Sequence, residues 1–116
     1  MKKFTTKLKT DQFELDGKVV TLTELTGDQR DDYNDFVRSR MTPNGKQKDG
    51  VDLLELKSTK GMDAKVISLA ATDSSGKPLK ESDIRQWPSK VQDYAATVVR
   101  DISGLSVSEE DEAKKD

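Results

Sequence analysis

Four acidic side chains recur at helical spacing early in the chain. They are Asp28, Asp31, Asp32 and Asp35. This spacing places the four carboxylates on one helix face, and carboxylate oxygens are the ligands that Ca²⁺ and Mg²⁺ prefer. The stripe lies opposite Tyr33 and Phe36, where an amphipathic helix faces water, and the helix dipole favours acid near its N-terminus. We therefore interpret the stripe as a solvated face and predict no metal site. A site for a cation or a basic partner is the alternative.

The side chains used in most enzyme chemistry are absent. The chain contains no His and no Cys, which excludes a thiolate nucleophile, a histidine general base, a disulfide and a Cys/His zinc site. The turn that starts at Asp73 has Ile84 where a calcium loop needs a twelfth-position Glu. The Gly-Lys pairs at 45–46 and 76–77 lack the other residues of a phosphate loop. The sequence predicts no catalytic residue, no cofactor and no small-molecule substrate.

Two features are candidates for partner contacts. Trp87, the only tryptophan, precedes Pro88 at the start of a predicted helix; it is either a core anchor between two helices or an interface hot spot. The lysines of residues 2–9 either protect an edge strand or contact an acidic partner. Binding of nucleic acid is not expected, because the helix after Trp87 offers only Lys90 and Arg100 as cations.

The composition indicates one small domain. The chain has 116 residues, of which 32% are hydrophobic and 36% are charged, with a net charge of −2. This length corresponds to one domain, and the low apolar content predicts a modest core that needs some cover from a partner subunit. Balanced charge argues against a strong nucleic-acid binder. No apolar run approaches the roughly 20 residues of a membrane span, so a cytoplasmic protein is expected.

The N-terminal residues carry a β pattern. Asp16-Gly17 separates two short alternating apolar runs, which is the strongest local signal for a hairpin. We predict a small antiparallel β element over about residues 3–25, with residues 3–9 available as a third, edge strand.

Helical spacing dominates the remainder. The helices are predicted over about residues 27–41, 51–72, 80–86 and 88–103. Thr26 and Gln29 form a capping box for the first helix, and a polar loop is expected between it and the second. Gly61 leaves open whether residues 51–72 are one helix or two, and we favour a helix near 62–72 with a short helix before it. Gly104 is placed as the residue that ends the last helix.

The predicted fold class is α+β. A β-hairpin or small antiparallel sheet is followed by a three- to four-helix, bundle-like domain. Together they form a single domain over residues 1–105. Residues 106–116 carry five acids and two lysines, a composition that predicts a flexible, disordered tail.

Three segments in this order resemble the tail assembly chaperones of long-tailed bacteriophages with non-contractile tails. The segments are the hairpin region 13–29, the Asp-x-x-Gly-x-Pro-Leu loop of 73–79 leading into 83–88, and the closing residues 102–106. The resemblance covers nearly the whole chain, and its motifs are structural rather than catalytic.

The resemblance implies a non-enzymatic protein of the infected cell's cytoplasm that is absent from the finished virion. Such proteins bind the tape-measure protein, help to recruit tail-tube protein and self-associate into oligomers. No contact with nucleic acid or membrane is implied. The alternative is a small regulatory or inhibitory adaptor that docks on one host protein.

The resemblance also implies a longer product made by a programmed −1 ribosomal frameshift. Ala113-Lys114-Lys115 can be encoded as a slippery heptamer, A AAA AAG, so Lys114 and Lys115 mark the candidate position. Lysine pairs are also common in charged tails.

Overall fold

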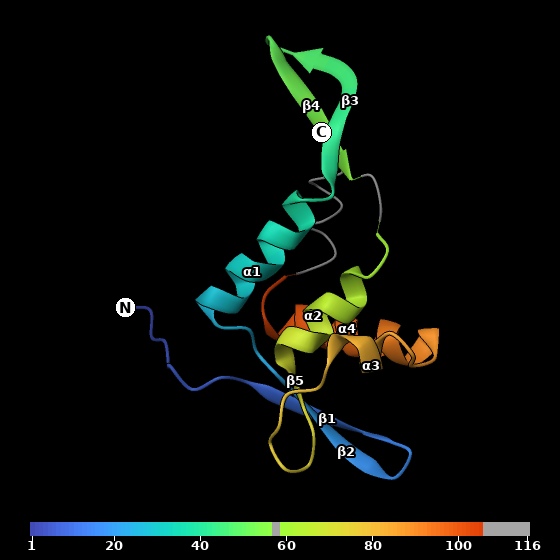
Figure 1. Cartoon of the computed structure of the whole chain (residues 1–116). Helices are drawn as coiled ribbons and strands as arrows, with labels where there is room; N and C mark the ends of the chain where they lie inside the picture. The colour runs from blue at the N-terminus through green and yellow to red at the C-terminus, as the bar shows by residue number, and fades with distance from the viewer. Residues whose placement is uncertain (57–58, 106–116) are drawn as a thin grey trace.

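The computed structural model describes residues 1–56 and 59–105, and it is an α+β fold (Figure 1). Strands β1 (Thr10–Leu15), β2 (Lys18–Thr23) and β5 (Ala71–Thr72) form an antiparallel sheet in the order β1-β2-β5. Asp16 and Gly17 turn the first hairpin with φ of 53° and 76°, which confirms the predicted turn. The predicted edge strand over residues 3–9 is wrong, because this segment is exposed, bends at Thr6 and forms no strand, and the third strand is β5.

Helix α1 (Gly27–Arg38) begins as the sequence indicates. The Thr26 hydroxyl accepts from the Gln29 backbone N–H at 3.2 Å, and the Gln29 side chain accepts from the Thr26 N–H at 3.0 Å. The helix ends at Arg38 rather than at residue 41, because the chain turns over residues 39 and 40 and enters a strand at Met41.

A second hairpin follows α1 and corrects the sequence analysis. Strand β3 (Met41–Lys48) pairs with β4 (Val51–Leu56), so the predicted loop and the predicted helix from residue 51 are both wrong here. The reason is the turn: Asp49 and Gly50 have φ of 54° and 77°, which gives the right-handed strand twist that a two-residue hairpin needs. The hairpin projects from the body beyond the end of α1 (Figure 1).

Three helices complete the fold. They are α2 (Met62–Ala70), α3 (Glu81–Ile84) and α4 (Ser89–Ile102). The favoured helix near 62–72 is confirmed as α2, whereas the short helix predicted before it is β4 instead, and the predicted 80–86 helix is a single turn. The last helix matches its predicted span to within one residue at each end. Leu105 N–H donates to the Arg100 carbonyl at 2.7 Å across Gly104, whose φ is 74°, which confirms the predicted cap.

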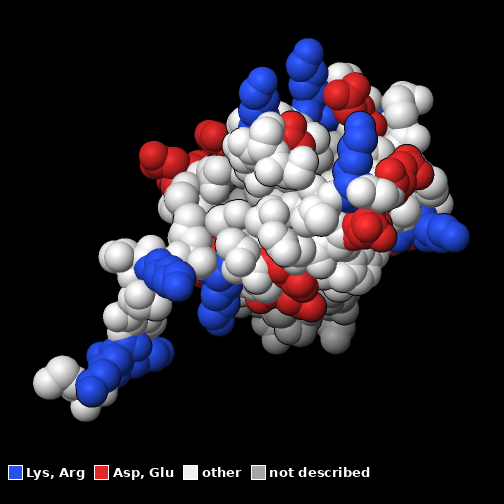
Figure 2. Space-filling model, turned by 90° about the horizontal axis from the view of Figure 1, so that it is seen from below, with Lys and Arg blue, Asp and Glu red and all other residues white. Residues whose placement is uncertain are grey.

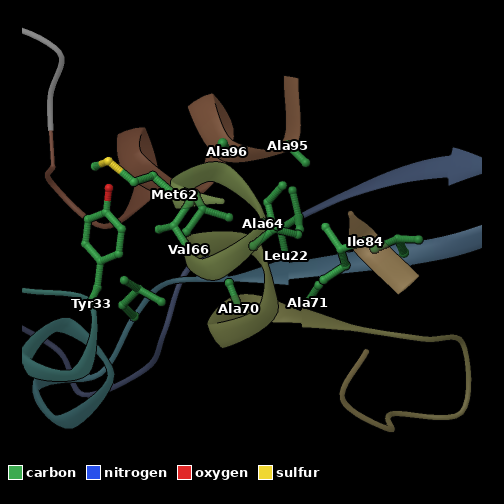
Figure 3. Close-up of a cluster of buried hydrophobic side chains, with 14 residues drawn as sticks. Leu22, Tyr33, Met62, Ala64, Val66, Ala70, Ala71, Ile84, Ala95 and Ala96 are labelled. Atoms are coloured by element: carbon green, nitrogen blue, oxygen red, sulfur yellow. The ribbon is translucent and has the colours of Figure 1, made fainter. Parts of the chain in front are cut away.

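The core lies around α2, which contacts β2 and α1, α3 and α4 (Figure 3). Its largest fully buried side chains are Leu22, Val66, Ile67, Ile84 and Val99. Ala64, Ala95 and Ala96 are also buried, and their small side chains allow α2 and α4 to approach closely. A helical bundle is not confirmed, because α2 contacts the sheet as well as the helices. The predicted tail over 106–116 lies outside the described residues.

Candidate interaction surfaces

The acidic face of α1 lies on the outside of the molecule. Asp28, Asp31, Asp32 and Asp35 are all exposed, whereas Tyr33 of the same helix is buried in the core. Within residues 1–56 and 59–105, no group of three or more acidic side chains is close enough to hold a metal ion. The arrangement is that of a solvated helix face.

An aromatic cluster forms where β1 meets the junction of α3 and α4. The ring of Phe13 lies edge-on between two others, with centroids 6.0 Å from Trp87 and 5.7 Å from Tyr94. Edge-to-face aromatic pairs are mutually stabilising at these distances. The Trp87 side chain is partly buried, whereas the Tyr94 side chain is exposed to 50% of its accessible surface. The cluster of Phe13, Trp87 and Tyr94 is therefore an ordered surface with an open side.

The backbone around Trp87 is fixed by α4. The Gln92 side chain donates to the Trp87 carbonyl at 2.9 Å, and the Trp87 N–H donates to the Ile84 carbonyl at 3.0 Å. Trp87 thus packs at the junction of two helices, as one of its two predicted roles requires. Its predicted role in an interface has no test in these contacts and stays a prediction.

The ring contacts that Phe13 makes with Trp87 and with Tyr94 were not predicted from the sequence. Phe13 belongs to the apolar face of β1, and Tyr94 belongs to the apolar stripe of α4. Each pattern predicted an element correctly, but the predicted core-facing side holds for Phe13 and not for Tyr94, which is half exposed. Neither predicted that the three rings meet, because the contact joins segments that are far apart in the sequence.

Arg100 ties three helices together. It forms an ion pair with Asp63 at 3.0 Å and donates to the Tyr33 hydroxyl at 3.1 Å, so α4 is joined to α2 and α1. Its side chain is largely buried. Arg100 is one of the two cations of this helix. Because its side chain is largely buried and paired with Asp63, it is not available to contact a phosphate, which weakens the case for nucleic-acid binding.

The loop at Asp73 is a structural turn. The Asp73 carboxylate accepts from the Ser75 hydroxyl at 2.7 Å, the Ser75 N–H at 2.9 Å and the Lys77 N–H at 3.0 Å. These bonds, the one from the Ser75 hydroxyl foremost, lower the pKa of Asp73. The carboxylate is thus directed into its own turn, in agreement with the failed match to a calcium loop.

Two exposed segments extend from the body. Residues 1–9 form an N-terminal arm that carries Lys2, Lys3, Lys7 and Lys9, and Figure 2 shows its cations extending away from the body. The second segment is the β3–β4 hairpin, on which Val51 and Leu54 are exposed. Both segments are candidates for contact with a partner.

None of the helices described over residues 1–56 and 59–105 is both long and apolar enough to span a membrane.

The family model described as "Bacteriophage lambda tail assembly chaperone, TAC, protein G" matches residues 6–116. No curated protein and no solved structure matches the chain. Because the family model covers almost the entire sequence, the chain belongs to the bacteriophage lambda tail assembly chaperone family.

Proposed function

We propose that this protein binds the tape-measure protein of its phage and helps to recruit tail-tube protein to it. The observation that carries the proposal is the family match over residues 6–116. Members of a chaperone family act by binding, which agrees with a chain that lacks His and Cys. We also propose that it acts in the cytoplasm of the infected cell and is absent from the finished virion.

Self-association belongs to the proposal for a physical reason. A long client with repeated apolar helical stretches needs a cover that is removed as the tail assembles. Weak contacts that are repeated along the client give high avidity and still allow stepwise displacement. A small domain with exposed apolar groups on projecting segments suits this role.

The aromatic cluster is the client-binding surface that we favour. Trp, Tyr and Phe are enriched in the centres of interfaces, and an amphipathic helix binds by its apolar face. Tyr94 is the most exposed of the three rings and belongs to none of the buried core. It can therefore be replaced without opening the interior.

Co-expression with tape-measure segments, followed by pull-down and titration, tests the proposal. Tyr94→Ser is expected to raise the dissociation constant roughly tenfold, as for an interface hot spot. Val19→Ser is the matched control, because Val19 is similarly exposed but lies on the opposite sheet face from Phe13. A wild-type protein that ignores every tape-measure segment would overturn the proposal and favour the adaptor alternative.

A longer, frameshifted product is the remaining part of the proposal. Its candidate position, Lys114 and Lys115, lies outside the described residues. The nucleotide sequence over codons 113–115 tests it directly. We expect an A AAA AAR heptamer and an open −1 frame behind it, and codons such as GCC AAG AAA would remove the frameshift.

A further inference from the structure

The outer edge of β4 is open and unprotected. Within the described residues β4 pairs only with β3, so its other side has unpaired backbone groups. Edge strands usually carry lysine, proline or a bulge that discourages pairing with other chains. β3 has all three in Pro43, Lys48 and the irregular register between residues 43 and 47. β4, with the sequence VDLLEL, has none of them, and its Val51 is 65% exposed.

The N-terminal arm has the composition of a strand but pairs with no strand among the described residues, and it bends at Thr6, where the Lys7 N–H donates to the Thr5 hydroxyl at 3.2 Å. It is exposed along its length, contains neither glycine nor proline, and includes Thr5 and Thr6, which favour strands. Phe4 is 85% exposed. The arm is joined to the body at Lys9, whose N–H donates to the Glu24 carboxylate at 2.9 Å and whose carbonyl accepts from the Glu24 N–H at 2.8 Å. Eight residues beyond that point reach about 26 Å when extended.

The two segments are complementary in charge and in composition. The arm carries four lysines and no acid, whereas β4 carries Asp52 and Glu55 and no base. Each also presents large apolar side chains to solvent, Phe4 on the arm and Leu54 on β4. Opposite charges and apolar pairs on neighbouring strands stabilise a sheet. Pairing of two β4 edges would instead bring acids beside acids.

We propose that residues 3–8 of one copy add as a strand to the β4 edge of a second copy. The arm leaves the body beside the β1–β2 hairpin, whereas the β3–β4 hairpin leaves it beyond α1 (Figure 1). Each copy then donates one arm and accepts another, which is a heterologous contact that produces rings or filaments. Strand addition of this kind uses backbone hydrogen bonds for affinity and side chains for selection. The inference rests on the self-association that forms part of the proposed function.

Charge exchange between two variants tests the contact. The arm variant is Lys3→Glu with Lys7→Glu, and the edge variant is Asp52→Lys with Glu55→Lys. Sedimentation velocity over a range of concentrations measures assembly of each variant alone and of their equimolar mixture. Lys3 and Lys7 share one face of the arm, whereas Asp52 and Glu55 lie on opposite faces of β4, so one of the two acids faces the lysines whichever way the strands pair. Either variant alone is expected to assemble roughly tenfold more weakly than wild type, because like charges then meet at that position. The mixture is expected to recover assembly, because each altered segment meets one of opposite charge.

The matched control is Asp31→Lys with Asp32→Lys. It changes the net charge as much as the edge variant does, but on the exposed face of α1, and it is expected to assemble like wild type. An edge variant that assembles normally, or a mixture that stays dissociated, overturns the inference. The inference is also overturned by a control that assembles as weakly as the edge variant, because assembly would then depend on net charge alone.

A crosslinking measurement covers the case in which charge reversal disturbs the hairpin. The chain has no cysteine, so Thr6→Cys in one copy can report on single cysteines placed in turn at positions 52–55 of another. A disulfide-linked heterodimer is expected only for those of the four positions that share a sheet face and register with residue 6, and not for Asp32→Cys. Absence of crosslinks at all four positions overturns the inference. Wild type that stays monomeric overturns both the inference and the self-association in the proposed function, whereas client binding is decided separately by the pull-down.

Discussion

The two β-hairpins have the same turn sequence, Asp-Gly, but the first packs into the core and the second projects into solvent. Asp16-Gly17 and Asp49-Gly50 adopt nearly identical φ angles, 53° and 76° in the first and 54° and 77° in the second. The first hairpin places Val20 and Leu22 in the core beneath the helices. The second projects into solvent, and Leu56 at its base is the residue of β4 that packs against the core cluster.

The difference in burial between the two hairpins shows that the feature that forms a hairpin, its turn, is distinct from the feature that stabilises the domain, its buried apolar area. Turn chemistry is local, so the same dipeptide reverses the chain at both places. Stability depends on apolar area removed from water, and only the first hairpin buries much of it. A two-stranded hairpin without a covered face is marginal in water. We therefore expect the second hairpin to open independently of the core and the first to open only when the whole domain unfolds.

Truncation of one leucine in each hairpin gives the largest expected contrast. Leu22 is 1% exposed and Leu54 is 53% exposed. Leu22→Ala is expected to lower the free energy of unfolding by about 2–5 kcal/mol, because it removes buried contacts and leaves a cavity. Leu54→Ala is expected to change it by less than about 0.5 kcal/mol.

Urea unfolding at low protein concentration measures both variants, because dilution keeps the chain monomeric. Equal losses would contradict the comparison and would mean that Leu54 is buried in the species measured. The same two variants measured at high protein concentration extend the comparison. Leu54→Ala is expected to lose more unfolding free energy there than at low concentration, because assembly of copies would cover β4.

Alanine at the two turn glycines gives a smaller contrast. Gly17 and Gly50 both have positive φ, and a Cβ added at either meets nothing within 4 Å, so the strain is confined to the backbone. Such strain costs about 1–2 kcal/mol for an L residue. Gly17→Ala is expected to lower global stability by about this amount, whereas Gly50→Ala is expected to speed amide hydrogen exchange in β3 and β4 alone. Loss of global stability in Gly50→Ala would show that the second hairpin is coupled to the core.

How far the fold follows from the sequence also differs between the hairpins. The first was predictable because alternating apolar residues flank its turn. The second was missed although Asp49-Gly50 offered the same signal. Pro43 and Gly45 made β3 resemble a loop, and the apolar run of 51–56 is compatible with a strand or a helix. The capping box at Thr26 and the closing Gly104 were predictable, because each is a local hydrogen-bonding pattern.

The candidate surfaces were predictable only in part. Trp87 was identified by its residue type, but its contact with Phe13, and that of Phe13 with Tyr94, depend on how β1 packs against the α3–α4 region. The exposure of β4 was also beyond the sequence, because it follows from the absence of a covering element among the described residues. The family was recognised from the order of segments along the whole chain and is confirmed by the match to residues 6–116.

The pH dependence of the turn at Asp73 gives the smallest expected effect, and it applies to the first sheet alone. This turn follows β5, which pairs with β2 through Thr72 and Thr21. The bond from the Ser75 hydroxyl, with those from backbone N–H groups, lowers the folded pKa of Asp73 below its ordinary value of 3.8. A carboxyl with a lowered folded pKa contributes stability above its unfolded pKa and loses it as the pH falls through the folded value.

Asp73→Asn keeps an acceptor but not the charge. The difference in urea midpoint between wild type and Asp73→Asn should therefore be constant above about pH 5 and shrink below about pH 4. Hydrogen exchange in β3 and β4 should be the same in both proteins throughout. A difference that grows on acidification would assign the effect to another carboxyl, and a change in β3 and β4 would show that the two sheets are coupled.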